Sequence, residues 1–600
     1  MSEQEEILTP EIRFHLIKKM ERHKVIALGG ATLLPHEAKY IEFHGVAGVI
    51  LFERNIHSLS QVNELIGRVT EQLSATEPDL PPLVMADHEG DLVAELRRII
   101  GAPPSAMAIA ATGDPDLARE VARETGLAMR KLGVNVVLAP VADCFFDAAS
   151  PITGLRTFGA EPERVAEFVA STITGFHEAG VLSCAKHFPG HGATPDDSHD
   201  TLPEVRKSLD ALRREDLVPF RRATEVGVDM MMISHVAFPL GSDVLAPASF
   251  DARIVNGLLR QEVGFDGVVI TDSLEMAGAR WYAQGYRGDV PSGGGFERSL
   301  LAGADLLLHT RPVPDAVEAD GAAEPVMSLN VMETIIRTLE KVVDRERIEE
   351  KLVAAAEKNE ALRNVLDILD RSGRRVADLR KRAAQGAPSP VKAPRGSKVI
   401  QLDTYPSVPA VYRRVAQQSI TRLATRPEQG TFLSDSACVV VPVEYAPSQS
   451  LKKHDIDGFV DALCKNFPRW QRTDVVTRFV VGEDGETYPD IRMGPPVVDA
   501  ARFTGAEATP FEPSGEEETV VVFSCRGRPP DEFLTALEAV AKRYEPAVVL
   551  VLGWPVTEWV PETTPVLLCF GASPQVASAA AEVLAGKREP VGEARGLWPV

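Results

Sequence analysis

Short apolar runs alternate with longer helical stretches through the first half of the chain, and this alternation limits what that half can fold into. Each run is about as long as one strand, ends in polar or charged residues and precedes a stretch with apolar residues at three-and-four spacing. Runs this apolar are typical of strands buried on both faces, as in parallel sheets. The predicted strands are residues 24–29, 47–52, 83–86, 134–139, 181–185, 228–233, 267–271 and 304–308. We therefore predict an α/β fold with an N-terminal (β/α)8 barrel; a doubly wound open sheet is the alternative.

Five stretches between the runs have the apolar spacing of amphipathic helices. They are residues 60–73, 114–132, 162–178, 217–226 and 252–262. Two of them begin with a residue type that caps helices, since Ser60 precedes Gln61 and Asp114 precedes Pro115. A serine or aspartate side chain accepts from a backbone N–H that the first turn leaves unpaired, and proline fits the first helical position. We predict Ser60 and Asp114 as N-caps.

Polar side chains follow seven of the predicted strands at the point where each strand ends. In a (β/α)8 barrel the carboxyl ends of all strands meet at one face, and that face carries the active site. The residues concerned are Glu53, Arg54, Asn55, Asp87, His88, Glu89, Asp143, Lys186, His187, Ser234, His235, Asp272, Ser273 and His309. Their shared position predicts a functional site at this end of the barrel.

The segment Lys186–Pro203 is the densest group of titratable side chains. It contains three of the thirteen histidines of the chain, at positions 187, 191 and 199, together with one lysine and several carboxylates. Its glycines and prolines interrupt any helix or strand. Shaped loops of this kind carry chemistry more often than packing, although a solvated polar loop is the alternative.

The remainder of the chain predicts a connector and a second domain. We expect the catalytic barrel over residues 1–320, a helical connector with a Pro/Gly-rich linker over 321–398, and a second α/β domain over 399–600. Predicted strands of the last part are 437–443, 475–481, 519–523, 547–552 and 565–570, with helices at 456–465, 530–542 and 574–585. Neither a GxGxxG nor a Walker pattern occurs, so nucleotide binding gains no support.

Charge and cysteine usage exclude several classes of partner. The net charge of −22 argues against nucleic acid and against anionic membrane surfaces. The acidic first residues do not resemble a secretory signal, and no apolar run is long enough to span a membrane. The six cysteines are scattered without CxxC spacing, which predicts reduced thiols in a cytoplasmic protein rather than disulfides or a zinc site. We expect no metal and no cofactor.

Several motifs together resemble one enzyme family. Residues 186–192 read KHFPGHG and are followed by Asp197, Ser198 and His199, which resembles the signature of glycoside hydrolase family 3 and of its β-N-acetylglucosaminidase (NagZ-type) branch. Further similar segments, in the order of the family, are 50–55, 87–90, 154–159 and 264–276. The likeness extends loosely to 416–421, 581–586 and 598–600. It implies a TIM-like barrel followed by a C-terminal α/β sandwich domain.

The resemblance implies a retaining mechanism with a covalent glycosyl-enzyme. It implies Asp272 as the nucleophile, although Asp272 before Leu274 and Glu275 also fits a helix N-cap. It implies His199 as the acid/base, with Asp197 two residues earlier. A carboxylate on the same side of an extended loop fixes the histidine tautomer and favours the imidazolium.

Two other chemistries fit the same segment. His187, His191 and His199 are candidates for a metal site, although helical or compact ligand spacing is missing. Lys186 is a candidate Schiff-base lysine. A structural role is the default interpretation of His191, which lies between two glycines.

For substrate binding the resemblance implies that Asp87, Arg156, Lys186 and His187 bind the hydroxyls of the terminal sugar. Charged partners suit this task because a buried hydroxyl without a partner is costly. Alone, Asp87 also fits a cap at the barrel rim, and Arg156 a surface ion pair.

The chain departs from the family pattern after Gly90. Leu92 and Glu95 stand where arginines are common, and Ala193 replaces a frequent aspartate. If Glu95 faces the site, it disfavours acidic ligands such as muramic-acid-containing fragments. Arg97 or Arg98 is a candidate to compensate.

These observations predict a β-N-acetylhexosaminidase that acts on a small carbohydrate and removes terminal N-acetylglucosamine from cell-wall (peptidoglycan recycling) or chitin-derived fragments. One alternative is a β-glucosidase or β-xylosidase of the same family, which takes its acid/base carboxylate from the second domain. Another is a phosphorylase, because a histidine repels incoming phosphate less than a carboxylate does. A non-catalytic sugar-binding protein is a further alternative.

Overall fold

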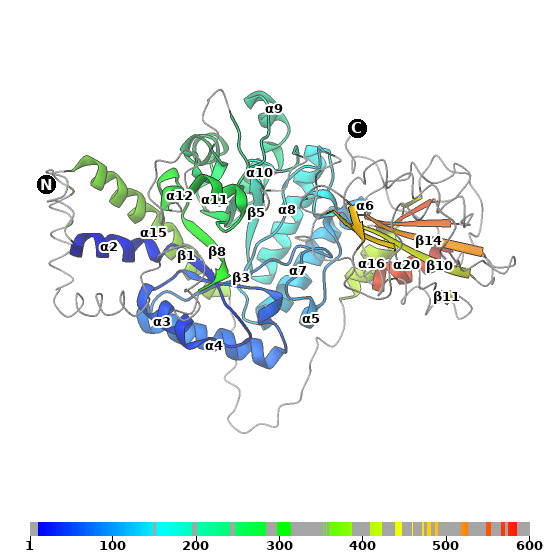
Figure 1. Ribbon diagram of the computed structural model, residues 1–600, viewed down its shortest axis with the longest axis horizontal. Helices are drawn as coiled ribbons and strands as arrows, with labels where there is room; N and C mark the ends of the chain where they lie inside the picture. The colour runs from blue at the N-terminus through cyan, green and yellow to red at the C-terminus, as the bar shows by residue number, and fades with distance from the viewer. Residues whose placement is uncertain are drawn as a thin grey trace, which may run out of the picture.

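The computed structural model resolves the barrel half of the chain almost completely (Figure 1). It describes residues 10–147, 150, 152–194, 198, 201–239, 246–283, 297–313, 352, 356, 359–386, 409–419, 421–422, 438–446, 459, 471–472, 477–481, 487–489, 518–525, 548–553, 566–569 and 574–584.

Eight parallel strands close into a barrel in chain order, with the last strand pairing with the first. They are β1 (Lys24–Ala27), β2 (Gly48–Leu51), β3 (Leu83–Ala86), β4 (Val136–Val137), β5 (Leu182–Phe188), β6 (Met230–Ile233), β7 (Val268–Ser273) and β8 (Leu306–Pro312). Each coincides with a predicted strand, so the predicted barrel is confirmed and the open sheet is wrong. The strands are almost wholly buried, which explains their continuous apolar runs.

Helices surround the barrel, and most of them connect one strand to the next. They are α2 (Pro10–Glu21), α3 (Pro35–His44), α4 (Leu59–Thr76), α5 (Arg97–Ile100), α6 (Ala106–Ala111), α7 (Pro115–Lys131), α8 (Pro162–Ala179), α9 (Leu209–Arg214), α10 (Leu217–Glu225), α11 (Ala277–Ala283) and α12 (Glu297–Ala302). Short 3-10 turns are η1 (Glu53–Asn55), η2 (Gly154–Arg156) and η3 (Ala248–Phe250), and a π-helix is η4 (Arg253–Val263). The stretch predicted as the helix 252–262 therefore forms with wider turns than its spacing suggested.

One of the two predicted caps is right. Asp114 accepts the Asp116 N–H at 3.0 Å at the start of α7. The prediction for Ser60 is wrong, because α4 begins at Leu59 and Ser58 accepts the Gln61 N–H. Ser58 has the extended backbone that a cap requires, whereas Ser60 already lies in the first turn.

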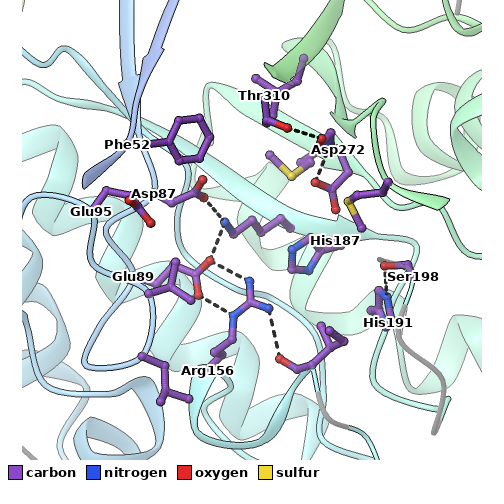
Figure 2. Close-up of a pocket in the computed structure, with 18 of the residues that line it drawn as sticks. Phe52, Asp87, Glu89, Glu95, Arg156, His187, His191, Ser198, Asp272 and Thr310 are labelled. Atoms are coloured by element: carbon purple, nitrogen blue, oxygen red, sulfur yellow. Dashed lines mark hydrogen bonds and ion pairs between the residues drawn. The ribbon is translucent and has the colours of Figure 1, made fainter. Parts of the chain in front are cut away.

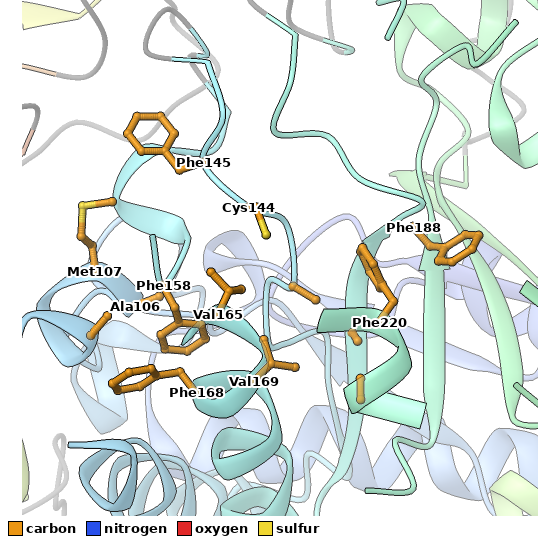
Figure 3. Packing of buried hydrophobic residues seen from close by; sticks show 14 of the residues in the cluster. Ala106, Met107, Cys144, Phe145, Phe158, Val165, Phe168, Val169, Phe188 and Phe220 are labelled. Atoms are coloured by element: carbon orange, nitrogen blue, oxygen red, sulfur yellow. The ribbon is translucent and has the colours of Figure 1, made fainter. Parts of the chain in front are cut away.

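Apolar packing between the barrel and its outer helices fixes the end of β5. Figure 3 shows Phe158 beside Phe168 and Phe188 beside Phe220. The first pair stacks at 5.5 Å between ring centroids, and the second meets edge to face at 5.3 Å. Because Phe188 ends β5 and Phe220 lies on α10, this contact anchors the strand that carries Lys186.

The long helix α15 (Glu360–Gly386) closes the amino end of the barrel. Its Arg375 pairs with Asp305 at 2.6 Å, and its Arg382 pairs with Asp229 at 2.5 Å. These two aspartates directly precede β8 and β6, so they mark the end of the barrel opposite the predicted site. Val376, Leu379 and Ala383 of α15 belong to the same buried cluster as the side chains inside the barrel.

The C-terminal part contains a second, mainly parallel sheet. Its strand order is β13-β12-β10-β14-β15-β16-β9, and β11 pairs with β10. The strands are β9 (Thr421–Arg422), β10 (Cys438–Ala446), β11 (Gln471–Arg472), β12 (Thr477–Val481), β13 (Thr487–Pro489), β14 (Glu518–Cys525), β15 (Val548–Gly553) and β16 (Val566–Cys569). The five strands predicted there and the helix predicted at 574–585, which is α20 (Pro574–Leu584), are confirmed. The helix predicted at 530–542, and nearly all of the one at 456–465, lie outside the described residues.

Helix α16 (Ala410–Ser419) joins this sheet to the barrel half. It packs against α20 on one side and against α6 and α7 on the other (Figure 1). The buried Tyr412 hydroxyl lies 2.6 Å from Thr125 Oγ1 on α7. None of the described helices is both long and apolar enough to cross a membrane.

Candidate active site

A cavity of about 440 Å³ opens where the barrel strands end. Its lining comes from strands β5 to β8 and from the segments after β2, β3, β5 and β7, together with η2. The residues that line it are Phe52, Glu53, Arg54, Asp87, Glu89, Leu92, Val93, Glu95, Ile152, Arg156, Lys186, His187, His191, Ser198, Met232, Asp272, Ser273, Met276, Leu308 and Thr310. Five of the predicted site residues, Asp87, Arg156, Lys186, His187 and Asp272, therefore meet at one cavity. Figure 2 shows the arrangement.

Lys186 lies at the centre of the charged side chains. It extends from β5, is 2% exposed, and its Nζ lies 2.6 Å from Asp87 Oδ1 and 2.5 Å from Glu89 Oε1. Burial alone would lower the pKa of Lys186, but the charges of Asp87 and Glu89 outweigh it and raise the pKa. A Schiff-base lysine reacts as a free amine, whereas the two carboxylates hold the Lys186 ammonium in ion pairs, so the structure favours an ion-pairing role for Lys186.

Arg156 and Glu89 form a buried two-point ion pair. Arg156 Nε and one terminal nitrogen each donate to a different Glu89 oxygen at 2.8 Å, and Arg156 also donates to the Ile152 carbonyl. Burial would raise the pKa of Glu89, but Arg156 and Lys186 lower it to about 2. Arg156 is therefore not a surface ion pair, and Glu89 is a permanent carboxylate beneath the cavity.

Glu89 and Asp143 belong to the site, although the family resemblance does not imply them; the signal for both is their position after predicted strands. Asp143 is fully buried and accepts from His187 Nδ1 at 2.7 Å and from the His191 backbone N–H at 2.8 Å. Burial would raise the pKa of Asp143, but the charge and hydrogen bond of His187 dominate and lower it. The carboxylate thus keeps a proton on His187 Nδ1 and fixes the orientation of the ring.

Asp272 lies on β7 at the cavity surface. The Ser273 backbone N–H donates to Asp272 Oδ1 at 2.7 Å, and the Ser273 hydroxyl lies 2.6 Å from that of Thr310 on β8. Helix α11 begins only at Ala277, so the N-cap interpretation of Asp272 is wrong. The strand itself, and not a helix terminus, holds this carboxylate.

His191 joins the cavity wall to Ser198. Its Nε2 lies 2.9 Å from the Ser198 hydroxyl, and the Ser198 carbonyl accepts the Gly278 N–H at 3.2 Å. Burial, and next the nearby His187, lowers the pKa of His191 to about 4, so the imidazole is neutral near pH 7. Ser198 is thereby held from both the β5 and the β7 side. The predicted catalytic residues Asp197 and His199 lie outside the described residues.

The departures after Gly90 lie on the cavity wall. Leu92 and Glu95 both line it. Arg97 donates to the carbonyls of Ala94 and Leu92, and Arg98 pairs with Glu53 at 3.0 Å. Neither arginine lines the cavity, but Arg98 offsets the charge of Glu53, which does.

The histidines of the site do not form a metal centre among the residues that the structure describes. No group of three or more His, Cys, Asp or Glu side chains there has the arrangement of ligands around one ion. The ring centroids of His187 and His191 are 6.1 Å apart, and His187 Nδ1 is already bonded to Asp143.

Comparisons with known proteins agree on the relationship of the barrel half. The family model described as the glycosyl hydrolase family 3 N terminal domain matches residues 19–358. A Beta-hexosaminidase of Pseudomonas aeruginosa is 36% identical over 293 residues, which are 48% of this chain and 82% of that protein. A Beta-hexosaminidase of Thiobacillus denitrificans is 36% identical over 294 residues, 47% of this chain and 77% of that protein.

A solved structure extends the likeness to the C-terminal part. A glycoside hydrolase family 3 beta-N-acetylglucosaminidase from Paenibacillus sp. str. FPU-7 is 27% identical, with a TM-score of 0.72 over 96% of this chain and 98% of that one. The barrel, the cavity at its carboxyl end and the matched residues lead to one conclusion: the chain belongs to glycosyl hydrolase family 3.

Proposed function

We propose that the chain is a retaining β-N-acetylhexosaminidase that removes terminal β-linked N-acetylglucosamine by double displacement. One observation carries the proposal: a strand-borne carboxylate, Asp272, shares a cavity with the buried cluster of Asp87, Glu89, Arg156 and Lys186. The names of the Pseudomonas and Paenibacillus relatives support the substrate.

In this mechanism Asp272 attacks C1 of the terminal sugar. The bond from C1 to the leaving oxygen breaks, and a glycosyl-enzyme ester forms that water then hydrolyses. The Ser273 backbone N–H donates to Asp272 Oδ1 and so stabilises the carboxylate that attacks C1. His199, assisted by Asp197, is proposed to give a proton to the leaving oxygen and to take one from the water.

The charged cluster is proposed to hold the sugar hydroxyls. Lys186 is a protonated donor, and Asp87 beside it is an acceptor that is only partly buried. Asp143 orients His187 so that its Nε2 is available to a hydroxyl. Arg156 acts by holding Glu89 and Lys186 in place. A fixed set of donors and acceptors favours a polyol over water because its members need no reordering on binding.

One observation bears on the choice of acceptor. Five carboxylates and three permanent cations line the cavity in the described residues, and this excess of negative charge supports water rather than phosphate as the acceptor. This observation favours a hydrolase over a phosphorylase.

The finer assignment, a cytoplasmic enzyme acting on chitin or cell-wall fragments, is part of the same proposal. It is supported by Cys144, Cys184 and Cys569, which are buried thiols and form no disulfide. Free thiols of this kind are typical of a reducing compartment.

A substrate panel tests the proposed function. Purified protein is assayed on the 4-nitrophenyl β-glycosides of N-acetylglucosamine, glucose and xylose, with and without phosphate. Cleavage of the first with release of free sugar is expected. Preference for the glucoside or xyloside would contradict the substrate assignment, and formation of a sugar 1-phosphate would contradict hydrolysis.

A further inference from the structure

The turn between Asp87 and Glu95 brings two carboxylates to one wall of the cavity. The Glu95 backbone N–H donates to the Asp87 carbonyl at 2.9 Å, and the Glu89 N–H donates to the Val93 carbonyl at 2.8 Å. These ladder-like bonds fold the segment back on itself, so residues 87 and 95 are neighbours although they are separated in sequence. Figure 2 shows both side chains on the same side of the pocket.

The Glu95 side chain has a fixed position. It is 5% exposed, lines the cavity, and its Oε2 accepts the Glu53 backbone N–H at 2.7 Å. A carboxylate tied to the main chain cannot swing away from a ligand without losing this bond. Its charge therefore acts on whatever occupies that end of the cavity.

The cations of the cavity are already engaged. Lys186 bridges Asp87 and Glu89, and Arg156 binds Glu89 through two bonds. Arg54 is attracted by Glu95, but its guanidinium donates to the Leu28 and Thr310 carbonyls and stacks 4.5 Å from the Phe52 ring centroid.

The cavity as a whole has a negative balance. Among its described lining residues, carboxylates exceed permanent cations by two, although Glu53 is also paired with Arg98 outside the lining. A wall of this kind accepts hydrogen bonds from hydroxyls and repels anions.

We infer that the wall formed by Asp87 and Glu95 selects the terminal sugar, accepting hydroxyls at its C4 and C6 end and excluding an anionic substituent there. The inference rests on the proposed function, because it takes C1 to lie at Asp272. C4 is the pyranose atom across the ring from C1. Figure 2 shows Asp272 on the other side of the pocket from Asp87 and Glu95. Glu95 is thus a specificity-determining residue, and uronic acids and 6-O-sulfated or 6-O-phosphorylated hexosamines are excluded as terminal units.

The test compares a neutral and an anionic sugar. Cleavage of 4-nitrophenyl N-acetyl-β-glucosaminide and of its 6-O-sulfate is measured at pH 7. Binding of N-acetylglucosamine and of its 6-sulfate is followed by calorimetry on the same preparations. We expect kcat/KM and affinity for the sulfated sugar to lie about a hundredfold or more below those for the neutral sugar, as expected for repulsion at close range in a partly buried site.

Glu95→Gln isolates the charge, because the amide oxygen still accepts the Glu53 N–H. We expect this variant to narrow the neutral-to-sulfated ratio about tenfold or more. Asp91→Asn is the matched control: it removes one carboxylate from the same turn, but Asp91 lines a different hollow, beside Ser105 and Tyr412. Its ratio is expected to equal that of the wild type.

The outcomes separate the two proposals. Equal handling of both sugars by the wild type, no binding of either, or an unchanged ratio in Glu95→Gln overturns the role of the wall. An equal narrowing in Asp91→Asn also overturns it, because the effect would then come from net charge alone. If neither glycoside is cleaved while the neutral sugar binds selectively and Glu95→Gln narrows the binding ratio, the proposed function fails and the selection by the wall stands.

Discussion

Arg156 holds Glu89 through two parallel hydrogen bonds of 2.8 Å, with both side chains at most 10% exposed. Arg156 on η2 and Glu89 in the loop after β3 are 67 residues apart in sequence, so the pair joins two distant parts of the chain. Planar two-point pairing needs a guanidinium, because an ammonium cannot present two parallel donors. The pair therefore fixes Glu89, and through it Lys186, at the base of the cavity.

In Arg156→Ala the Glu89 carboxylate stays buried and keeps only Lys186 as a counter-charge. We expect the substitution to lower the free energy of unfolding by about 3–5 kcal/mol, as is usual when one partner of a buried pair is removed. Arg156→Lys retains the positive charge but not the two parallel hydrogen bonds. We expect it to be less destabilised than Arg156→Ala and still to have a reduced kcat/KM. Urea unfolding monitored by circular dichroism measures the first effect. Equal stability of Arg156→Ala and wild type would contradict the pairing.

Glu89 gives the protein an acid-sensitive contribution to stability. Its pKa is about 2 in the fold, where Arg156 and Lys186 outweigh burial, and it is higher in the unfolded chain. The unfolded state therefore takes up the proton first as the pH falls. The contribution is full above about pH 5 and is lost as the pH falls toward 2.

The matching measurement is the unfolding free energy between pH 6 and pH 3. We expect the wild type to lose on the order of 2 kcal/mol more than Glu89→Gln over this interval, because the glutamine cannot titrate. The variant is also less stable at neutral pH, since Arg156 and Lys186 lose a counter-charge. Parallel pH profiles for the two proteins would show that Glu89 is not held ionised.

Gly192 lies where a side chain has no space. A Cβ built there would come within 1.5 Å of the Cys144 carbonyl oxygen, which is backbone and cannot yield cheaply. Gly192→Ala must displace either the loop after β5 or the segment that carries Asp143. We expect loss of at least tenfold in kcat/KM and roughly 2 kcal/mol in stability.

Gly257 on η4 is the matched control, since an added Cβ there meets nothing within 4 Å. Gly257→Ala is expected to be neutral or stabilising by up to about 1 kcal/mol, as for glycine replaced in a helix. If Gly192→Ala behaved like Gly257→Ala, the close approach to Cys144 would be refuted.

The barrel half and the C-terminal half are joined by a buried hydroxyl pair. Tyr412 lies 2.6 Å from Thr125, and burial raises the pKa of the tyrosine. Tyr412→Phe leaves the Thr125 hydroxyl with its bond to the Val121 carbonyl and is expected to cost about 1 kcal/mol. Tyr412→Ala also creates a cavity and is expected to cost about 3–5 kcal/mol.

Arg414, on the same helix, provides the comparison. It pairs with Glu120, but the two side chains are 46% and 40% exposed. Exposed pairs contribute about 0–1 kcal/mol, so Arg414→Ala is expected to change stability little. Thermal unfolding of the three variants ranks them, and a larger loss in Arg414→Ala than in Tyr412→Ala would contradict the importance of the buried contact.

The barrel was predictable because its strands are buried on both faces. Runs such as Leu83–Ala86 and Met230–Ile233 consist of apolar residues throughout. Asp87, which follows the first run, lines the cavity, whereas Ser234 and His235, which follow the second, are buried and do not line it. The same rule collected Asp87, Lys186, His187 and Asp272 at one end of the barrel. These residues lie together because of the barrel topology, which short-range sequence patterns predict well.

Contacts between distant loops were not predictable. Nothing near Glu89 in the sequence indicates that Arg156 binds it, because the pair depends on how η2 is placed across the barrel mouth. The Glu95 side chain faces the cavity because backbone hydrogen bonds in its turn bring it beside Asp87. No residue pattern specifies these bonds. Likewise, the cap of α4 is Ser58 rather than Ser60 because backbone conformation, and not residue type, separates two nearby serines.

The most direct test of the account is the covalent intermediate on Asp272. The protein is treated with a fluorinated N-acetylglucosaminyl fluoride that glycosylates a nucleophile faster than water releases the sugar, and its peptides are analysed by mass spectrometry. We predict a sugar adduct on the peptide containing Asp272, and none in Asp272→Asn, whose turnover falls by about 10³-fold or more. Turnover of the N-acetylglucosaminide with the adduct on another residue, or full activity of Asp272→Asn, would contradict the account.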